Sequence, residues 1–197
     1  MSDEQKAINW LEDNYKGLLL GLFLGLSILF GYKSLLSSQN TAQLELSRQF
    51  DIAVNNYQEG KTDQIVEYAK INMTANPDNI YTALANLYSA KAMYSGNKLD
   101  EAVTFLDHII SNTSDSDIVN LAKYRKAKIL IEQSEYSTAL NILGTSLDNY
   151  QHIELRGDIY LLQNNKNEAL NHYNQVLAFE ITPNERKNIL AKINLVK

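Results

Sequence analysis

The side chains that could do chemistry are few and far apart in this sequence. The three histidines, His108, His152 and His172, are scattered, and none has a partner at the spacing of a metal site. The absence of cysteine excludes a thiolate metal site, a cysteine nucleophile and a disulfide scaffold. The sequence contains no phosphate-binding loop, dinucleotide fingerprint, serine-hydrolase elbow or zinc-protease motif. It therefore predicts a protein that is not an enzyme, without catalytic residues, cofactor or metal ion.

The densest cationic segment is AKYRKAK, at residues 122–128. Its four cations are Lys123, Arg125, Lys126 and Lys128. On a helix they spread around the exposed arc, which favours a solvated surface; the alternative is a clamp for a partner's C-terminal carboxylate. Nucleic acid is not expected as a partner, because the formal net charge of -5 does not provide the basic surface that it requires.

Near the N-terminus lies a long uncharged run, GLLLGLFLGLSILFGY, at residues 17–32. As a helix it rises roughly 24 Å, somewhat less than the ~30 Å hydrocarbon core of a bilayer. Lys16 and Lys33 at its ends can extend their ammonium groups to the interface, where Trp10 and Tyr32 also fit. Its leucine, phenylalanine and isoleucine residues contribute roughly -3 to -6 kcal/mol to insertion. The run therefore predicts a helix in the membrane.

Two other interpretations of this run are weaker. A cleaved secretion signal has a short basic lead, whereas here a longer tail with four carboxylates precedes the run, and no clean cleavage site follows. The other alternative is a buried helix in a soluble core. The residues favour an uncleaved transmembrane helix at 17–36 after a short tail at 1–16. Its orientation stays open, because equal numbers of basic residues flank its two ends.

Four glycines recur along this predicted membrane helix: Gly17, Gly21, Gly25 and Gly31. At about 100° per residue they share an arc of roughly 120° on one face. Such a stripe lets a second helix approach closely and pack by van der Waals contact. Glycine is also common in membrane helices generally. The stripe is therefore either a packing surface for a membrane partner or a matter of composition.

The rest of the chain is nearly free of helix breakers, which predicts an all-α domain. Its clearest repeating unit covers residues 153–177, where Gly157 and Tyr160 precede a turn and Ala169 and Tyr173 follow it. This order is typical of a tetratricopeptide repeat, a pair of helices of about 34 residues. The small residues are needed because the two helices of a pair cross closely.

The same order recurs three more times, with decreasing clarity. The residues that mark these repeats are Ala53, Gly60, Ala90, Ala102, Ala127 and Ala139. In the first repeat Ile65 stands where a small residue is usual. We predict about four helix pairs at 37–181 and a capping helix at 182–197, where Thr182 and Glu185 have the spacing of a capping box. The predicted fold is all-α: one N-terminal transmembrane helix, a tetratricopeptide-like solenoid of helical hairpins and a C-terminal capping helix.

Over nearly its full length the chain resembles the tetratricopeptide-like ancillary subunits of the bacterial Sec translocon. The resemblance is carried by INWLEDN in the tail, by the glycine-striped run, and by AVNNYQEGKTDQI, LRGDIYLLQNNKNEAL and AKIN further on. Its specific part is the LRGD segment together with the single N-terminal span. The resemblance implies a cytoplasmic N-terminus, one helix in the bacterial inner membrane and a periplasmic domain.

The resemblance also implies partners. These are the membrane subunits of the Sec translocon, a membrane-anchored chaperone of the prolyl-isomerase type, and exported polypeptides that are still unfolded. Repeat solenoids present a long surface that is used for binding. The leading function is therefore that of an interaction protein that assists the folding of newly exported proteins. The alternative is an assembly scaffold in the cell envelope that binds no client.

Overall fold

The computed structural model of the 197-residue chain describes residues 25–29 and 41–196. The tail at 1–16 and most of the predicted membrane helix, with Gly17, Gly21 and Gly31, lie outside these residues. Residues 25–29, which include Gly25, are helical. Within the two described ranges, no helix combines the length and the apolar character that a membrane crossing requires.

The chain separates into two compact units, Met1–Gln49 and Phe50–Lys197. In the first unit residues 25–29 and 41–49 are helical. Arg48 there donates a hydrogen bond to Glu45, one helical turn before it, at 2.9 Å.

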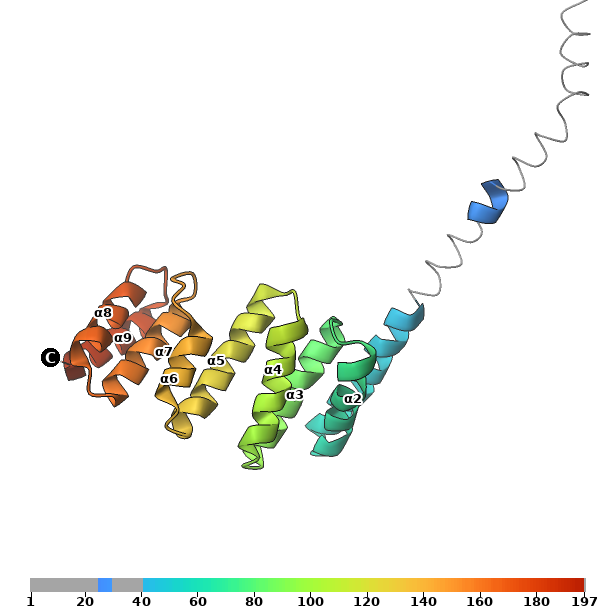
Figure 1. Cartoon of the computed structure of the whole chain (residues 1–197), viewed down its shortest axis with the longest axis horizontal. Helices are drawn as coiled ribbons and strands as arrows, with labels where there is room; N and C mark the ends of the chain where they lie inside the picture. Colours follow the sequence, from blue (N-terminus) through green and yellow to red (C-terminus); the bar gives the residue numbers. More distant parts are fainter. Residues whose placement is uncertain (1–24, 30–40, 197) are drawn as a thin grey trace, which may run out of the picture. The chain divides into compact units, whose positions relative to one another are not determined.

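The second unit is made of helices throughout its described residues. A helix that ends at residue 58 is followed by α2 (Thr62–Ala75), α3 (Ile80–Ser95), α4 (Leu99–Asn112), α5 (Ser116–Glu132), α6 (Tyr136–Leu143), α7 (Tyr150–Leu162), α8 (Lys166–Val176) and α9 (Pro183–Val196). Each helix packs on the next one along the chain, and α5 also contacts α7 (Figure 1). The all-α prediction is thus confirmed for the described part of the chain.

The turns inside the hairpins repeat the same backbone geometry. Each contains one residue in the left-handed region, namely Gly60, Asn97, Ser134 and Asn164. In the turn from α3 to α4 the amide of Asn97 donates to the Tyr94 carbonyl at 3.0 Å, and the amide of Lys98 donates to the Met93 carbonyl at 2.8 Å. The other three turns have the same pair of hydrogen bonds. This is the Schellman motif, which satisfies the last carbonyls of the first helix and reverses the chain.

The hydrophobic core extends along the helices as three linked clusters. The helix that ends at residue 58 and α2 to α5 share the first, α5 to α7 share the second, and α7 to α9 share the third. Both α5 and α7 contribute to two clusters, because opposite faces of these helices pack on preceding and following neighbours. This arrangement, in which each repeat contacts only its neighbours, is that of a solenoid.

The helix α9 covers the C-terminal end of this core. Ile189, Ile193 and Val196 on one of its faces are buried against α8. At its start the amide of Thr182 donates to the Glu185 carboxylate at 2.7 Å, and the amide of Glu185 donates to the Thr182 hydroxyl at 3.3 Å. The predicted capping box is therefore confirmed, and it satisfies two amides that an uncapped helix would leave without partners.

Candidate functional site

The clearest repeat brings Gly157 of α7 directly against Tyr173 of α8. A Cβ atom added to Gly157 would lie 2.6 Å from Cε1 and 2.8 Å from Cδ1 of Tyr173. The Tyr173 ring is fully buried, and Ala169, one turn earlier on α8, is also fully buried. Tyr160 stacks on His172, with their ring centroids 5.3 Å apart. Only glycine fits at position 157, because the two helices cross there without room for a side chain.

The other residues predicted to mark the repeats have two different roles. Those that lie buried between helices, each at most 5% exposed, are Ala53, Ala90, Ala102, Ala127 and Ala139. Gly60 is exposed and provides the left-handed turn residue of its hairpin, with φ at 86°. Ile65 is fully buried where the other repeats have alanine. The first pair therefore accommodates a larger side chain at its crossing.

The LRGD segment at residues 155–158 holds several elements together. The guanidinium of Arg156, which is 4% exposed, donates to the carbonyls of Gly144 and Ser146 in the loop before α7. Asp158 accepts a hydrogen bond from the Tyr173 hydroxyl at 2.8 Å. Its carboxylate also pairs with Lys192 of α9, at 2.6 Å. Each polar side chain of the segment is thus engaged within the fold.

Lys192 is neutralised within the protein. Its ammonium group contacts Glu154 at 2.7 Å as well as Asp158. Burial alone would lower the pKa of Lys192, but the hydrogen bonds to the two carboxylates raise it above its ordinary value. Burial and the hydrogen bond to Asp158 likewise raise the pKa of Tyr173. This cluster ties α7, α8 and α9 together, and its one cation is fully paired with carboxylates.

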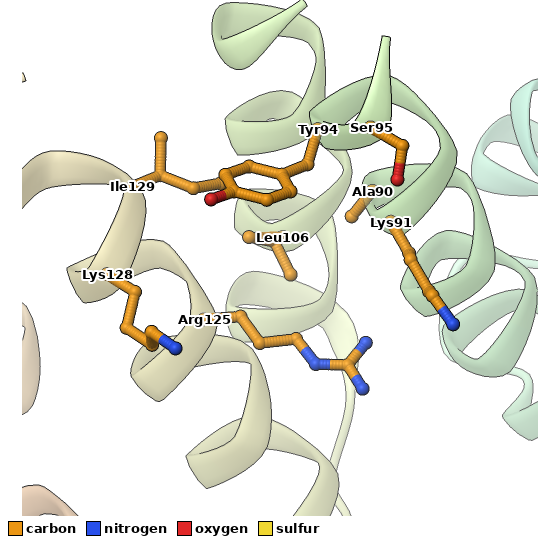
Figure 2. Close-up of a pocket in the computed structure, with 8 residues that line it drawn as sticks. All are labelled: Ala90, Lys91, Tyr94, Ser95, Leu106, Arg125, Lys128 and Ile129. Atoms are coloured by element: carbon orange, nitrogen blue, oxygen red, sulfur yellow. The ribbon is translucent and has the colours of Figure 1, made fainter. Parts of the chain in front are cut away.

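A different arrangement is found between α3 and α5, where a cleft of about 400 Å³ opens (Figure 2). Lys91 and Tyr94 approach it from α3, and Arg125 and Lys128 approach it from α5. Its apolar floor is formed by Ala90, Leu106 and Ile129. The two helices that flank the cleft are the first helices of neighbouring hairpins, so no single repeat contains the whole site.

The cations of this cleft lack carboxylate partners. Within residues 41–196, no aspartate or glutamate lies at ion-pair distance from Lys91, Arg125 or Lys128. Arg125 is half-buried, and its one hydrogen bond to the described residues is a long one of 3.4 Å to the Leu87 carbonyl. Burial lowers the pKa of the Arg125 guanidinium, because desolvation disfavours its charged form. The cleft is therefore a local cationic surface on a chain of negative net charge.

Two neighbouring groups limit the extent of this cationic surface. Lys126 does not line the cleft and pairs with Asp107 of α4. The Tyr94 hydroxyl donates a hydrogen bond to Glu132 at the end of α5, so one carboxylate borders the cleft on that side. The basic segment at 122–128 is thus divided: Arg125 and Lys128 face the cleft, and Lys126 is used to hold α4 and α5 together.

Sequence reasoning missed the cleft because its cations come from two repeats. Lys91 precedes Arg125 by a full repeat, and only packing of α3 beside α5 brings them to one place. The one local signal is the spacing of Arg125 and Lys128, which puts both on one face of a helix. Within residues 25–29 and 41–196, no group of three metal-ligating side chains comes together.

Comparisons with known proteins agree with this architecture. Residues 8–197 match the family model described as tetratricopeptide repeat-like domain. The ancillary SecYEG translocon subunit of Buchnera aphidicola (strain APS) is 30% identical over 175 residues, which cover 86% of this chain and 88% of the relative. That of Escherichia coli (strain K12) is 27% identical over 197 residues, covering 98% of this chain and 95% of the relative.

A solved structure supports the fold independently. The crystal structure of MamA superposes with a TM-score of 0.58 and covers 74% of this chain and 82% of its own. At 15% sequence identity, this likeness shows the helical repeat fold alone. The tetratricopeptide-like solenoid predicted from the repeats is thereby confirmed.

Proposed function

Because this chain belongs to the tetratricopeptide repeat-like family of ancillary SecYEG translocon subunits, we propose that it is a membrane-anchored interaction protein that associates with the Sec translocon. The observation that carries the proposal is the extent of the likeness. The family model begins at residue 8 and therefore includes the uncharged run as well as the helical repeats. A likeness confined to the repeats would support only a general binding role.

The anchor in this proposal is the helix at 17–36. The N-terminal tail at 1–16 lies in the cytoplasm, and the repeats at 37–181 and the capping helix at 182–197 lie in the periplasm. The uncharged run with its flanking lysines supports the single span, and family membership supports the orientation. The glycine stripe then faces a membrane subunit of the translocon.

The helical array in this proposal contacts chains and chaperones on the periplasmic side. Its clients are newly exported polypeptides, and its neighbour is a membrane-anchored chaperone of the prolyl-isomerase type. The cleft between α3 and α5 supports a binding role, because it combines unpaired cations with an apolar floor. A packed helix pair that served only as a spacer would have no need of such a feature.

The role of the stripe leads to a prediction for Gly21→Leu. A leucine on the stripe holds the two backbones apart, so recovery of translocon membrane subunits with the tagged full-length protein should fall by about three- to tenfold. The measurement is quantitative copurification from membranes in mild detergent. Leu19→Phe enlarges the opposite face of the helix and serves as the control, with recovery unchanged. Equal recovery with both variants would remove the packing role of the stripe.

A further inference from the structure

We propose that the cleft between α3 and α5 binds an extended polypeptide segment that presents carboxylate side chains on both sides of an apolar one. The inference deepens the proposed function and rests on it, since it names the kind of segment that the array binds. It depends on three features of the cleft: its unpaired cations, its apolar floor and its position between two hairpins.

The cations determine the charge of the ligand. Lys91 on α3 and Arg125 and Lys128 on α5 border one cleft, and none of them is paired with a carboxylate of the described chain. The Lys128 ammonium lies 5.9 Å above the Tyr124 ring, a contact that leaves its hydrogen-bonding capacity unused. A half-buried guanidinium without a carboxylate has lost part of its hydration, which an incoming carboxylate replaces. The favoured ligand is therefore an anion.

The cations of the cleft differ from Lys192, which has a structural role. Lys192 is also a partly buried cation that bridges helices, but Glu154 and Asp158 neutralise it within the fold. Lys126, a neighbour of Arg125 on α5, is neutralised in the same way by Asp107. Lys126 and Lys192, which both bridge helices, are thus paired with carboxylates, whereas the three cations that surround the cleft are not.

The floor determines the apolar part of the ligand. The floor consists of three residues from successive helices, Ala90, Leu106 and Ile129. Each of them has at most 5% of its surface exposed. The volume of about 400 Å³ falls within the range of about 300–1,000 Å³ that is usual for ligand sites. An aliphatic side chain on this floor would bring carboxylates on either side of it to the surrounding cations.

The number of cations favours an internal acidic segment over a chain terminus. A C-terminal carboxylate brings one negative charge, whereas three positive charges surround this cleft. The Glu132 carboxylate, which borders one side of the cleft, already accepts a hydrogen bond from Tyr94. Because the flanking helices belong to different hairpins, the cleft also suits a chain that passes across both.

The test uses full-length protein in mild detergent and labelled peptides whose C-termini are amidated. The acidic peptide contains the sequence Gly-Ser-Asp-Leu-Glu-Ser-Gly, and the matched neutral peptide has Asn and Gln in place of Asp and Glu. Fluorescence anisotropy should show binding of the acidic peptide at least about tenfold tighter than that of the neutral one, and weaker at high salt. A third peptide, neutral in its side chains but with a free C-terminal carboxylate, should bind like the neutral one.

The variant for this test combines Lys91→Gln with Lys128→Gln. Both side chains are exposed, so the protein should unfold at the same temperature as the wild type while its affinity for the acidic peptide falls by about tenfold. The control combines Lys70→Gln with Lys166→Gln, which changes the charge equally at exposed positions on α2 and α8 and should leave affinity unchanged.

Three results would overturn the inference. These are equal binding of the acidic and neutral peptides, including no binding of either; tightest binding of the peptide with the free carboxylate; and equal weakening by the control variant. A failure of the inference about the cleft can be told apart from a failure of the proposed function. The measurement is the recovery of translocon subunits with the Lys91→Gln, Lys128→Gln protein. If recovery persists while the peptide result fails, the inference about the cleft is wrong and translocon association stands.

Discussion

Replacing Gly157 by valine should lower the free energy of unfolding by about 3 kcal/mol, the largest loss that we expect from a single small substitution in the repeats. The first added carbon would already lie 2.6 Å from the Tyr173 ring, and the two methyl groups beyond it need further space. The ring has nowhere to move, because it is fully buried and its hydroxyl is bound to Asp158. The intrinsic preference of valine over glycine in a helix, a few tenths of a kcal/mol, offsets little of this cost.

The matched control for this prediction is Gly96→Ala. A Cβ atom at Gly96 would make only ordinary contacts, at 3.5 Å from the carbonyl oxygens of Ala92 and Met93, and φ at Gly96 is negative. Stability should change by no more than about 0.5 kcal/mol. Both variants are measured by denaturant unfolding of the detergent-purified full-length protein, followed by circular dichroism.

A compensating change at Tyr173 makes the prediction more specific. If the loss comes from the contact with the ring, Tyr173→Leu should cost less in the Gly157→Val protein than in the wild type, because leucine makes room for the added methyl groups. Additive losses, or a Gly157→Val protein as stable as Gly96→Ala, would show that α7 and α8 do not cross at these residues.

Placing arginine at both Leu22 and Leu26 should release the protein from the membrane. Each exchange of leucine for arginine near the centre of a membrane helix raises the free energy of insertion by about 3–4 kcal/mol. Two exchanges cost roughly 6–8 kcal/mol, which exceeds the -3 to -6 kcal/mol expected for the whole run. The protein should therefore move from the membrane fraction to the supernatant on alkaline carbonate extraction.

The control for this experiment exchanges the same two leucines for alanine. That change removes side-chain volume but adds no charge, so the alanine variant should stay in the membrane fraction. Retention of the arginine variant to the same extent as wild type would mean that something other than the uncharged run attaches the protein to the membrane.

Features that depend on local sequence could be predicted well. The capping box at Thr182 and Glu185 follows from spacing alone, because both partners lie within one helical turn. The order of Gly157, Ala169 and Tyr173 indicated a close helix pair, since the crossing itself demands small residues at these positions. The all-α solenoid followed from the repetition of this order along the chain.

Features that depend on partners in another repeat could not be predicted. Lys126 and Lys128 look equivalent in the sequence, yet one pairs with Asp107 on α4 and the other borders the cleft. The role of Arg156 could not be predicted either, because the carbonyls that it binds belong to a loop and lie 12 and 10 residues earlier in the chain. The membrane helix at 17–36 remains a prediction, since most of it lies outside the described residues.

The central claim is that the uncharged run spans the inner membrane and holds the helical array in the periplasm. Its most direct test measures on which side of the membrane each end of the protein lies. The chain has no cysteine, so Ser2→Cys in the tail and Lys166→Cys on the surface of α8 each introduce a single reactive thiol. A membrane-impermeant maleimide is added to intact spheroplasts and, separately, to lysed ones. We predict that the Lys166→Cys protein is labelled in intact spheroplasts and that the Ser2→Cys protein is labelled only after lysis. Labelling of the Lys166→Cys protein only after lysis would contradict the account.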